Sequence, residues 1–293
     1  MIYSVYQKTR ALLEMIRFSH TIFAFPFALM AAALAARITG ALPAVGQLLW
    51  ICLAMVGART GAMACNRLID VRIDAANPRT ADRHLPAGRV ALRDALALAV
   101  AGFALLLLAA WRLNPLCLVL APLAIGLLVL YSYCKRFTSL SHLVLGLCLG
   151  SAPIGAWIAL RGALEWPPLI LGLAVLCWVA GFDIFYALQD EEFDRSQGLH
   201  SMPARLGARR AIALARLLHG LMIILLALLA LLAPLGSFYL GGVLLVAGLL
   251  VYEHHLVKVD DLSRLNMAFF TVNGYVSLGI FGFTLIDVAL SWS

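Results

Sequence analysis

Long apolar runs alternate with short polar segments along the 293 residues of this chain. Nine of these runs approach the roughly 20 residues that an α-helix needs to cross a bilayer. They cover about residues 20–36, 44–65, 95–111, 115–133, 140–160, 168–189, 211–234, 237–252 and 267–290. The pattern predicts an all-α integral membrane protein with nine transmembrane helices.

The composition agrees with this prediction. Hydrophobic residues make up 63% of the chain and charged residues only 13%, whereas roughly 25% of the residues in a soluble domain are charged. The six cysteines lie in or beside the apolar runs without a CxxC pair. We therefore interpret them as small buried residues, and not as a metal or redox site.

The positions of the basic residues predict the orientation of the chain. With the N-terminus on the cytoplasmic side, 17 of the 22 Lys and Arg residues fall in cytoplasmic segments and three in the opposite loops, as the positive-inside rule requires. The net charge of +7 then reflects membrane topology, and it does not indicate nucleic-acid binding. Residues 2–18 mix apolar and basic side chains, which is typical of a helix at the inner interface and not of a cleaved signal peptide. We expect a multi-pass protein of the bacterial inner membrane.

Two acidic segments end the second and the sixth apolar runs, 120 positions apart. In the first aspartate segment (residues 66–74) and the second (residues 186–194), Asp70 matches Asp190 and Asp74 matches Asp194. The same offset relates Lys135 to a polar segment after the eighth run. We therefore expect a single domain over 1–293 with two parallel four-helix repeats, at about 12–136 and 140–256, and a final helix at about 267–290.

An even number of crossings separates the two aspartate segments, so both are expected on the cytoplasmic face. Each is followed by a long polar segment, at residues 75–90 and 195–209, that is rich in Arg and interrupted by Pro and Gly. We expect these segments to fold as caps over the carboxylates. Their basic residues would then bind an anionic group.

The spacing within each segment places carboxylates on one face of a helix. The expected faces carry Asn66, Asp70 and Asp74 in the first segment, and Asp183, Tyr186 or Ala187, Asp190 and Asp194 in the second. Mg²⁺ takes one or two carboxylates and completes its shell with water and phosphate oxygens. A pair of solvated helix ends is the plainer interpretation of either segment alone. Two segments matched in spacing, side and basic flank favour a Mg²⁺ and diphosphate site facing one cavity.

A diphosphate at the inner face of an apolar helical bundle indicates a lipid diphosphate. If its tail is allylic, departure of the diphosphate leaves a carbocation, which aromatic faces stabilise. The aromatic candidates are Phe23, Phe27, Phe182, Phe185 and Tyr186, although each of them alone is more often a packing residue.

The motifs at these positions resemble the signature regions of the UbiA superfamily of intramembrane aromatic prenyltransferases. The resemblance rests on N-x-x-x-D-x-x-x-D followed by N-P-R-T-A-D-R-x-L-P-A-G, and on D-x-x-Y-A-x-x-D-x-x-x-D followed by G-x-x-S-x-P-A. It covers nearly the whole chain. It implies nine transmembrane helices around a central cavity and Mg²⁺-dependent transfer of a polyprenyl group onto an aromatic ring.

The resemblance also implies roles for individual residues. Asp70, Asp190 and Asp194 would be catalytic, and the Mg²⁺ and diphosphate would be held by Asn66, Asp70, Asp74, Asp190 and Asp194. Cationic partners of the diphosphate would be Arg79, Arg83, Lys135 and Arg136, and cavity residues would be Asp183 and Tyr186. For the carboxylate of the aromatic acceptor, the candidates are Arg17, Arg59 and Arg72.

One position departs from the family pattern. Arg67 follows Asn66, where the common motif has an aspartate, so the number of metal ions is open. The Asn-Arg start is most similar to a subgroup resembling 4-hydroxybenzoate polyprenyltransferases, some of which prenylate 1,4-dihydroxy-6-naphthoate in the futalosine route to menaquinone. The implied partners are a polyprenyl diphosphate, a small aromatic acceptor and the bilayer. Prenyl chain length and oligomeric state stay open.

Other classes of protein remain as alternatives. A membrane transporter of an anionic or lipid-linked substrate also combines repeats with intramembrane polar groups, but its charges are expected at the bilayer midplane. A phosphotransferase acting on nucleotide-activated alcohols packs its aspartates into one stretch, which this sequence lacks. Within the superfamily, prenylation of haem or chlorophyll is a further alternative.

Two polar features remain inside or beside the last runs. Glu253, His254 and His255 are expected in an interfacial loop at the end of the eighth run. Asn273, within the ninth, must find a hydrogen-bond partner in the bundle.

Overall fold

In a computed structural model, residues 10–15 and 23–291 are described, and they form helices joined by turns. The long helices are α2 (Phe25–Thr39), α3 (Val45–Ala76), α4 (Leu92–Leu113), α5 (Pro115–Cys134), α6 (Ser141–Arg161), α7 (Trp166–Ala187), α10 (Ala208–Leu232), α11 (Ser237–Leu256) and α12 (Asn273–Leu290). Shorter elements are the 3₁₀ turn η2 (Leu188–Asp190), α8 (Glu191–Ser196), α9 (Met202–Leu206) and the π-helical turn η3 (Met267–Val272). The predicted all-α membrane fold is confirmed.

Each of the nine predicted spans coincides with one of the long helices. Among the described residues, eight helices are long and apolar enough to cross a membrane, and α2, with 15 residues, is shorter than the others. The first residues of the predicted span at 20–36 lie outside the described part of the chain. The count of nine spans therefore stays a prediction.

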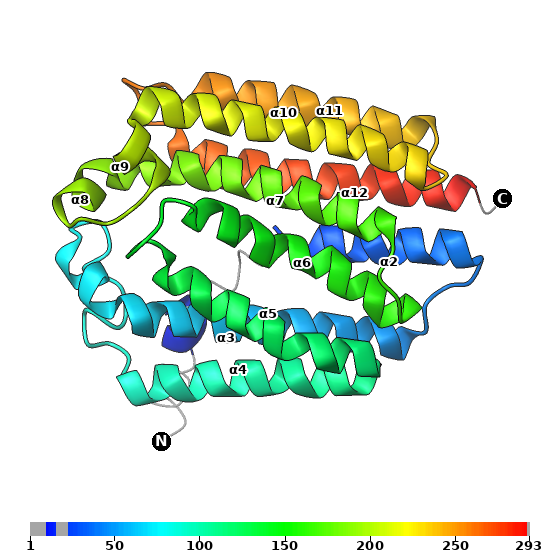
Figure 1. Cartoon of the computed structure of the whole chain (residues 1–293), viewed down its shortest axis with the longest axis horizontal. Helices are drawn as coiled ribbons and strands as arrows, with labels where there is room; N and C mark the ends of the chain where they lie inside the picture. The colour runs from blue at the N-terminus through cyan, green and yellow to red at the C-terminus, as the bar shows by residue number, and fades with distance from the viewer. Residues whose placement is uncertain (1–9, 16–22, 292–293) are drawn as a thin grey trace. The chain divides into compact units, whose positions relative to one another are not determined.

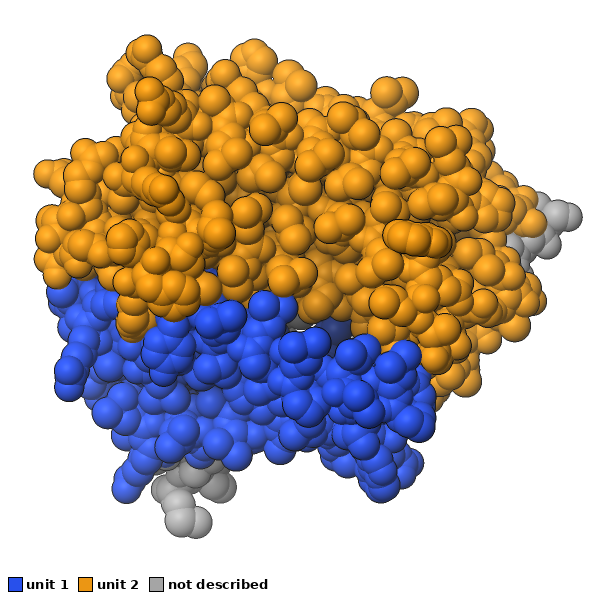
Figure 2. All heavy atoms as spheres, in the orientation of Figure 1, with its two compact units in different colours: residues 1–21, 49–133 blue, residues 22–48, 134–293 orange. Residues whose placement is uncertain are grey.

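The chain divides into two compact units (Figure 2). Unit 1 comprises residues 1–21 and 49–133, and unit 2 comprises residues 22–48 and 134–293. Unit 2 includes α2, which precedes unit 1 in the sequence. The expected repeats at 12–136 and 140–256 stay a prediction.

Glycines allow two helices of unit 1 to approach each other closely. A Cβ atom built on Gly57 would lie 2.7 Å from the carbonyl oxygen of Gly102, and one on Gly61 would overlap the Phe103 ring. Small residues at a crossing let helix backbones touch, which is how helices associate in a bilayer, where the hydrophobic effect supplies no attraction between them. This close contact packs α3 against α4. Helix α3 carries the first aspartate segment.

The polar segment after α3 folds back onto its own unit. Leu85 and Val90 from this segment are buried in a cluster with Met15, Ala64 and Ala95. Gly88 takes a positive φ of 69° at the last turn before α4, a conformation that glycine adopts without strain. The apolar side chains of this segment therefore hold its basic residues beside the end of α3.

Helix α7 is the centre of unit 2. Figure 1 shows α10 and α11 side by side on one side of α7 and α12, and α6 and α2 on the other, in agreement with the contacts between these helices. A Cβ on Gly172 of α7 would lie 2.7 Å from the Gly150 carbonyl oxygen of α6, and one on Gly146 would overlap the Leu176 carbonyl. The close contact of α6 and α7 places their polar side chains within hydrogen-bond distance of each other.

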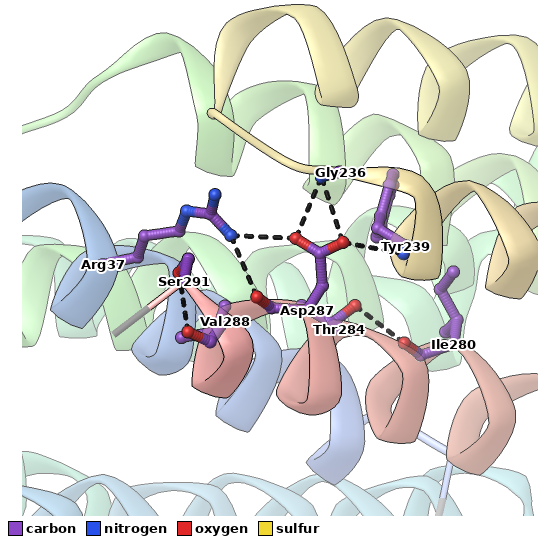
Figure 3. Close-up of polar contacts among 8 residues, drawn as sticks. All are labelled: Arg37, Gly236, Tyr239, Ile280, Thr284, Asp287, Val288 and Ser291. Atoms are coloured by element: carbon purple, nitrogen blue, oxygen red, sulfur yellow. Dashed lines mark hydrogen bonds and ion pairs between the residues drawn. The ribbon is translucent and has the colours of Figure 1, made fainter. Parts of the chain in front are cut away.

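A buried carboxylate near the C-terminal end of α12 joins three helices of unit 2 (Figure 3). Asp287 near the end of α12 accepts hydrogen bonds from Arg37 Nη1 of α2 at 2.8 Å, from the Gly236 N–H at 2.9 Å and from the Tyr239 N–H at 3.1 Å. The N–H groups at the start of α11 lack partners within that helix. Asp287 satisfies two of them and neutralises Arg37.

The structure corrects one expectation about the second aspartate segment. Asp183, Asp190 and Asp194 do not share one regular helix, because α7 ends at Ala187 and a 3₁₀ turn precedes α8. At this end the side-chain amide of Gln189 donates to the Tyr186 carbonyl at 3.3 Å. A side chain that satisfies a terminal carbonyl competes with continuation of the helix. The first aspartate segment, in contrast, is continuous helix up to Ala76.

Candidate active site

The first aspartate segment occupies the last turns of α3. Asn66 Nδ2 donates to Asp70 Oδ2 at 2.9 Å and to the Ser132 hydroxyl at 3.3 Å. Because the amide nitrogen has two acceptors, the amide oxygen of Asn66 is left as an acceptor, the type of atom that binds a hard cation. The predicted pairing of Asn66 and Asp70 on one helix face is confirmed.

Asp74 is buried between two arginines. Its Oδ1 lies 2.6 Å from Arg83 Nη1, and its Oδ2 lies 3.4 Å from Arg67 Nη1. The Thr80 hydroxyl donates to the Asp74 carbonyl at 2.9 Å, so the segment after α3 is bonded to the helix end. Asp74 thus forms ion pairs with both arginines, and its contact with Arg83 joins the segment after α3 to the end of that helix.

The other predicted basic residues of unit 1 lie in different environments. Arg59 is half-buried in the middle of α3, whereas Arg72 and Arg79 are exposed near its end. The Arg79 backbone N–H donates to Asn77 Oδ1 at 2.9 Å, which places Arg79 in a turn. Arg17 lies outside the described residues.

The second aspartate segment presents two buried carboxylates. Asp190 is 6% exposed in η2 and Asp194 is 2% exposed in α8. Lys135 Nζ lies 3.6 Å from Asp194 Oδ2, beyond hydrogen-bond distance, and the half-buried Arg136 follows Lys135. No hydrogen bond to this oxygen is found among the described residues. A buried carboxylate oxygen without a donor is costly, so a bound cation would stabilise it.

The structure adds a residue that sequence reasoning missed. His142 Nδ1 lies 2.6 Å from Asp183 Oδ2, and the Met202 N–H donates to His142 Nε2 at 3.2 Å. Since Nε2 accepts, the neutral ring carries its proton on Nδ1 and donates to Asp183. His142 thereby links α6, α7 and α9, and it positions the segment that follows Asp194. The sequence showed only a histidine inside an apolar run.

Aromatic rings of unit 2 pack along α7 beside Asp183. The Tyr186 ring centroid lies 4.4 Å from that of Phe269, which lies 5.2 Å from Phe182, and Phe182 lies 5.6 Å from Phe23. Phe269 belongs to the π-helical turn η3, a type of irregularity that is frequent at functional sites. Of the expected aromatics, Phe185 instead faces His219 and His254.

Comparison with known proteins identifies the family. The model of the UbiA prenyltransferase family matches residues 24–275. The 4-hydroxybenzoate octaprenyltransferase of Vibrio cholerae serotype O1 is 33% identical over 236 residues, which are 78% of this chain and 80% of that protein. The chain belongs to the UbiA prenyltransferase family. This UbiA protein is therefore an enzyme that transfers prenyl groups, as expected.

Further comparisons agree with this family assignment. A 4-hydroxybenzoate octaprenyltransferase of Francisella tularensis subsp. novicida is 28% identical over 84% of this chain and 86% of its own length. The apo structure of a UbiA homolog from Aeropyrum pernix K1 is 34% identical with a TM-score of 0.83, covering 92% of this chain and 98% of that one. A UbiA homolog from Archaeoglobus fulgidus, bound to GPP and Mg²⁺, shares the fold at 21% identity and a TM-score of 0.70, covering 95% and 99% of the two chains.

The oxygen ligands of this UbiA protein fit Mg²⁺. The described residues contain no group of three or more His, Cys, Asp and Glu close enough to hold a metal ion by themselves. Mg²⁺ does not need one, because it takes one or two carboxylates together with water and phosphate oxygens. Asp194 Oδ2, which has no hydrogen bond within the described part of the chain, and the amide oxygen of Asn66 are oxygen atoms of this type.

The structure of α11 and α12 differs from another expectation for the UbiA protein, which concerns Glu253 and His254. Glu253 and His254 belong to the last turn of α11 and not to an interfacial loop, and Glu253 is fully buried. The Asn273 amide donates to Glu253 Oε1 at 2.9 Å, and the Trp178 indole donates to Asn273 Oδ1 at 2.6 Å. The network satisfies Oε1 of the buried carboxyl group, while Oε2 has no hydrogen bond among the described residues. The prediction that Asn273 has a partner in the bundle is confirmed.

Proposed function

We propose that this UbiA enzyme transfers a polyprenyl group from an allylic polyprenyl diphosphate to a hydroxylated aromatic carboxylate in ubiquinone or menaquinone biosynthesis. The acceptor would be 4-hydroxybenzoate or 1,4-dihydroxy-6-naphthoate. The observation that carries the proposal is the buried carboxylate Asp194, whose Oδ2 has no hydrogen bond from residues 10–15 or 23–291 and lies 3.6 Å from Lys135 Nζ. The names of the relatives support the acceptor class.

The residues of the two aspartate segments would bind the reacting group. Asn66, Asp70, Asp74, Asp190 and Asp194 would hold Mg²⁺ and, through it, the diphosphate. When bound, Mg²⁺ neutralises charge that develops on the departing diphosphate. Arg79, Arg83, Lys135 and Arg136 would contribute positive charge at the same group. The 2.6 Å contact of Arg83 with Asp74 would hold the guanidinium in place before substrate binds.

Breaking the bond between the allylic carbon and oxygen leaves its electron pair on the diphosphate and a cation on the prenyl chain. The faces of Phe182, Tyr186 and Phe269 would stabilise that cation and exclude water from it. The acceptor ring then supplies an electron pair for the new carbon–carbon bond and loses a proton. Among the candidate partners of its carboxylate, Arg59 lies within a membrane-spanning helix, where a charged side chain usually serves function.

An assay with purified protein tests the proposal. Mg²⁺ and a polyprenyl diphosphate are supplied with 4-hydroxybenzoate and 1,4-dihydroxy-6-naphthoate in parallel, and prenylated product and released diphosphate are measured by mass spectrometry. We expect product with one of the acceptors, and a loss of at least about a hundredfold in Asp70→Asn or Asp190→Asn. Glu192→Gln is the matched control, because Glu192 is exposed between Asp190 and Asp194.

The outcomes separate the alternatives. Wild-type turnover in either aspartate variant, with the variants folded by thermal melting, contradicts the assignment of the site. Uptake of an anionic or lipid-linked substrate into vesicles without product would favour the transporter. The metal requirement is tested separately: EDTA should abolish prenyl transfer, and added Mg²⁺ should restore it.

A further inference from the structure

A groove of 830 Å³ lies between α10 and α11 in unit 2, and no residue of the two aspartate segments lines it. Helix α10 lines it from Arg209 to Ile223, and α11 lines it from Ala247 to its end. Val257 to Asp260 of the following segment complete it. None of its lining residues is among those that we assign to prenyl transfer.

Positive charge gathers at one end of the groove. Arg209, Arg216 and Lys258 are exposed there, and Asp260 is the one carboxylate among the lining residues. Within the described ranges, neither Arg209 nor Arg216 has a hydrogen bond or an ion pair with another side chain. With neutral histidines, the lining residues carry a net charge of about +2.

The neighbouring carboxylate Asp261 does not line the groove. Hydrogen bonds from the Ser263 side chain and backbone N–H lower the pKa of Asp261, and the backbone bond measures 3.0 Å. The charge of Lys258 also lowers the pKa of Asp261, so Lys258 is partly compensated. Arg209 and Arg216 do not act on Asp261, and their charge remains for an anion in the groove.

Away from the cations, the groove is apolar. Ile223, Ala247, Leu250 and Val251 line the part beyond the histidines, while Ile212 lies between Arg209 and Arg216. At 1.5 Å per residue, the stretch of α10 from Arg209 to Ile223 measures about 21 Å. A small soluble anion would not need such a trough, whereas an acyl chain of a phospholipid would follow it.

Two histidines, His219 and His254, lie between the charged end of the groove and its apolar part. His219 is 2% exposed, and its Nδ1 lies 3.1 Å from His254 Nε2 while its Nε2 lies 3.2 Å from the Trp178 carbonyl. Any side chain at Gly181 would overlap the His219 ring. Since the ring is held from both sides, the groove is formed before a ligand arrives.

The charged end lies where the membrane meets water. Arg209 is at the start of α10, directly after α9, and Lys258 follows the end of α11. Basic residues at helix ends attract anionic lipid headgroups, and basic pockets between transmembrane helices bind them. We propose that this groove binds an anionic phospholipid, with its phosphate at Arg209, Arg216 and Lys258 and an acyl chain along α10 and α11.

Native mass spectrometry of the purified full-length protein tests the proposal. The detergent-solubilised protein is titrated with phosphatidylglycerol or phosphatidylcholine of identical acyl chains. We expect wild type to retain phosphatidylglycerol preferentially and Arg209→Gln/Arg216→Gln to lose about fivefold in affinity for each charge removed, equivalent to ~1 kcal/mol per cation. The matched control is Arg210→Gln/Arg264→Gln, which removes the same charge from exposed residues outside the groove and should bind as wild type does.

Three results would overturn the proposal. Equal losses of phosphatidylglycerol affinity in the two double variants would mean that the effect of charge is not specific to the groove. Equal retention of phosphatidylglycerol and phosphatidylcholine would mean that the site does not select for charge. Displacement of phosphatidylglycerol by millimolar inorganic phosphate or pyrophosphate would mean a site for soluble anions. If Arg209→Gln/Arg216→Gln fails to fold, the single variants Arg216→Gln and Lys258→Gln carry the same comparison.

Discussion

The carboxylates of this UbiA enzyme differ in what surrounds them. Asp287 is satisfied by Arg37 and by the N–H groups of Gly236 and Tyr239, and its place in the molecule is explained by those bonds. Asp194 is as deeply buried but has an oxygen without a donor among the described residues. Because burial of a charge that lacks hydrogen bonds opposes folding, the first carboxylate stabilises the protein, whereas the second has only the 3.6 Å contact with Lys135 to offset its burial.

Asp287→Ala is therefore expected to affect stability. The substitution leaves Arg37, whose side chain is 15% exposed, without its counter-charge and frees two N–H groups at the start of α11. We expect a loss of about 3 kcal/mol in the free energy of unfolding, measured by thermal or denaturant unfolding in detergent. Glu165→Ala is the control, because the exposed pair of Arg161 and Glu165 should contribute less than about 1 kcal/mol. Similar losses in both variants would contradict this view of Asp287.

Among the elements, the contact of α6 with α7 connects packing to the site. Gly150 and Gly172 bring the two backbones together. The same two helices carry His142 and Asp183, whose 2.6 Å contact depends on that approach. A substitution at the glycine contact should thus alter the distance between His142 and Asp183, which lie two to three turns away.

Gly150→Ala tests this connection. Its Cβ would overlap the Gly172 carbonyl oxygen, and overpacking of this kind costs about 1–3 kcal/mol. Gly155→Ala lies on the same helix with no atom within 4 Å of the new Cβ, so it should stay within about 1 kcal/mol of wild type. We expect lower melting temperature and lower prenyl transfer in Gly150→Ala alone. Unchanged turnover in a destabilised Gly150→Ala variant would show that the crossing does not position the site.

For the whole molecule, the number of spans determines the side of the C-terminus. The distribution of Lys and Arg predicts a cytoplasmic N-terminus, and nine crossings then place the C-terminus outside. Eight helices have the length and composition of spans, and α2 is shorter. Whether α2 crosses the membrane is therefore the open point in the topology.

Fusions in a bacterial host test this topology. Alkaline phosphatase joined after Ser293 should be active, because that enzyme folds outside the cytoplasm, and green fluorescent protein at the same position should be dark. A truncated fusion after Gly198, in a predicted cytoplasmic segment, should give the reverse result. If α2 does not cross and the N-terminus is cytoplasmic, both results reverse, with a dark fluorescent fusion at Gly198 and a fluorescent one at Ser293. Fluorescent fusions at both positions would mean that α10, α11 and α12 do not all cross the membrane.

The sequence alone determined the helical membrane fold, the positions of its spans and the aspartate segments, because hydrophobic length and i, i+4 spacing are local properties. It also identified Asn66 with Asp70 as neighbours, since they share one continuous helix. Only the tertiary structure showed that Asp74 neutralises Arg67, that His142 holds Asp183 and that Glu253 is buried against Asn273. Arg67 and Asp74 lie two turns apart on α3, but Asp183 and Glu253 find their partners on other elements of the chain, so packing decides which buried polar groups are satisfied.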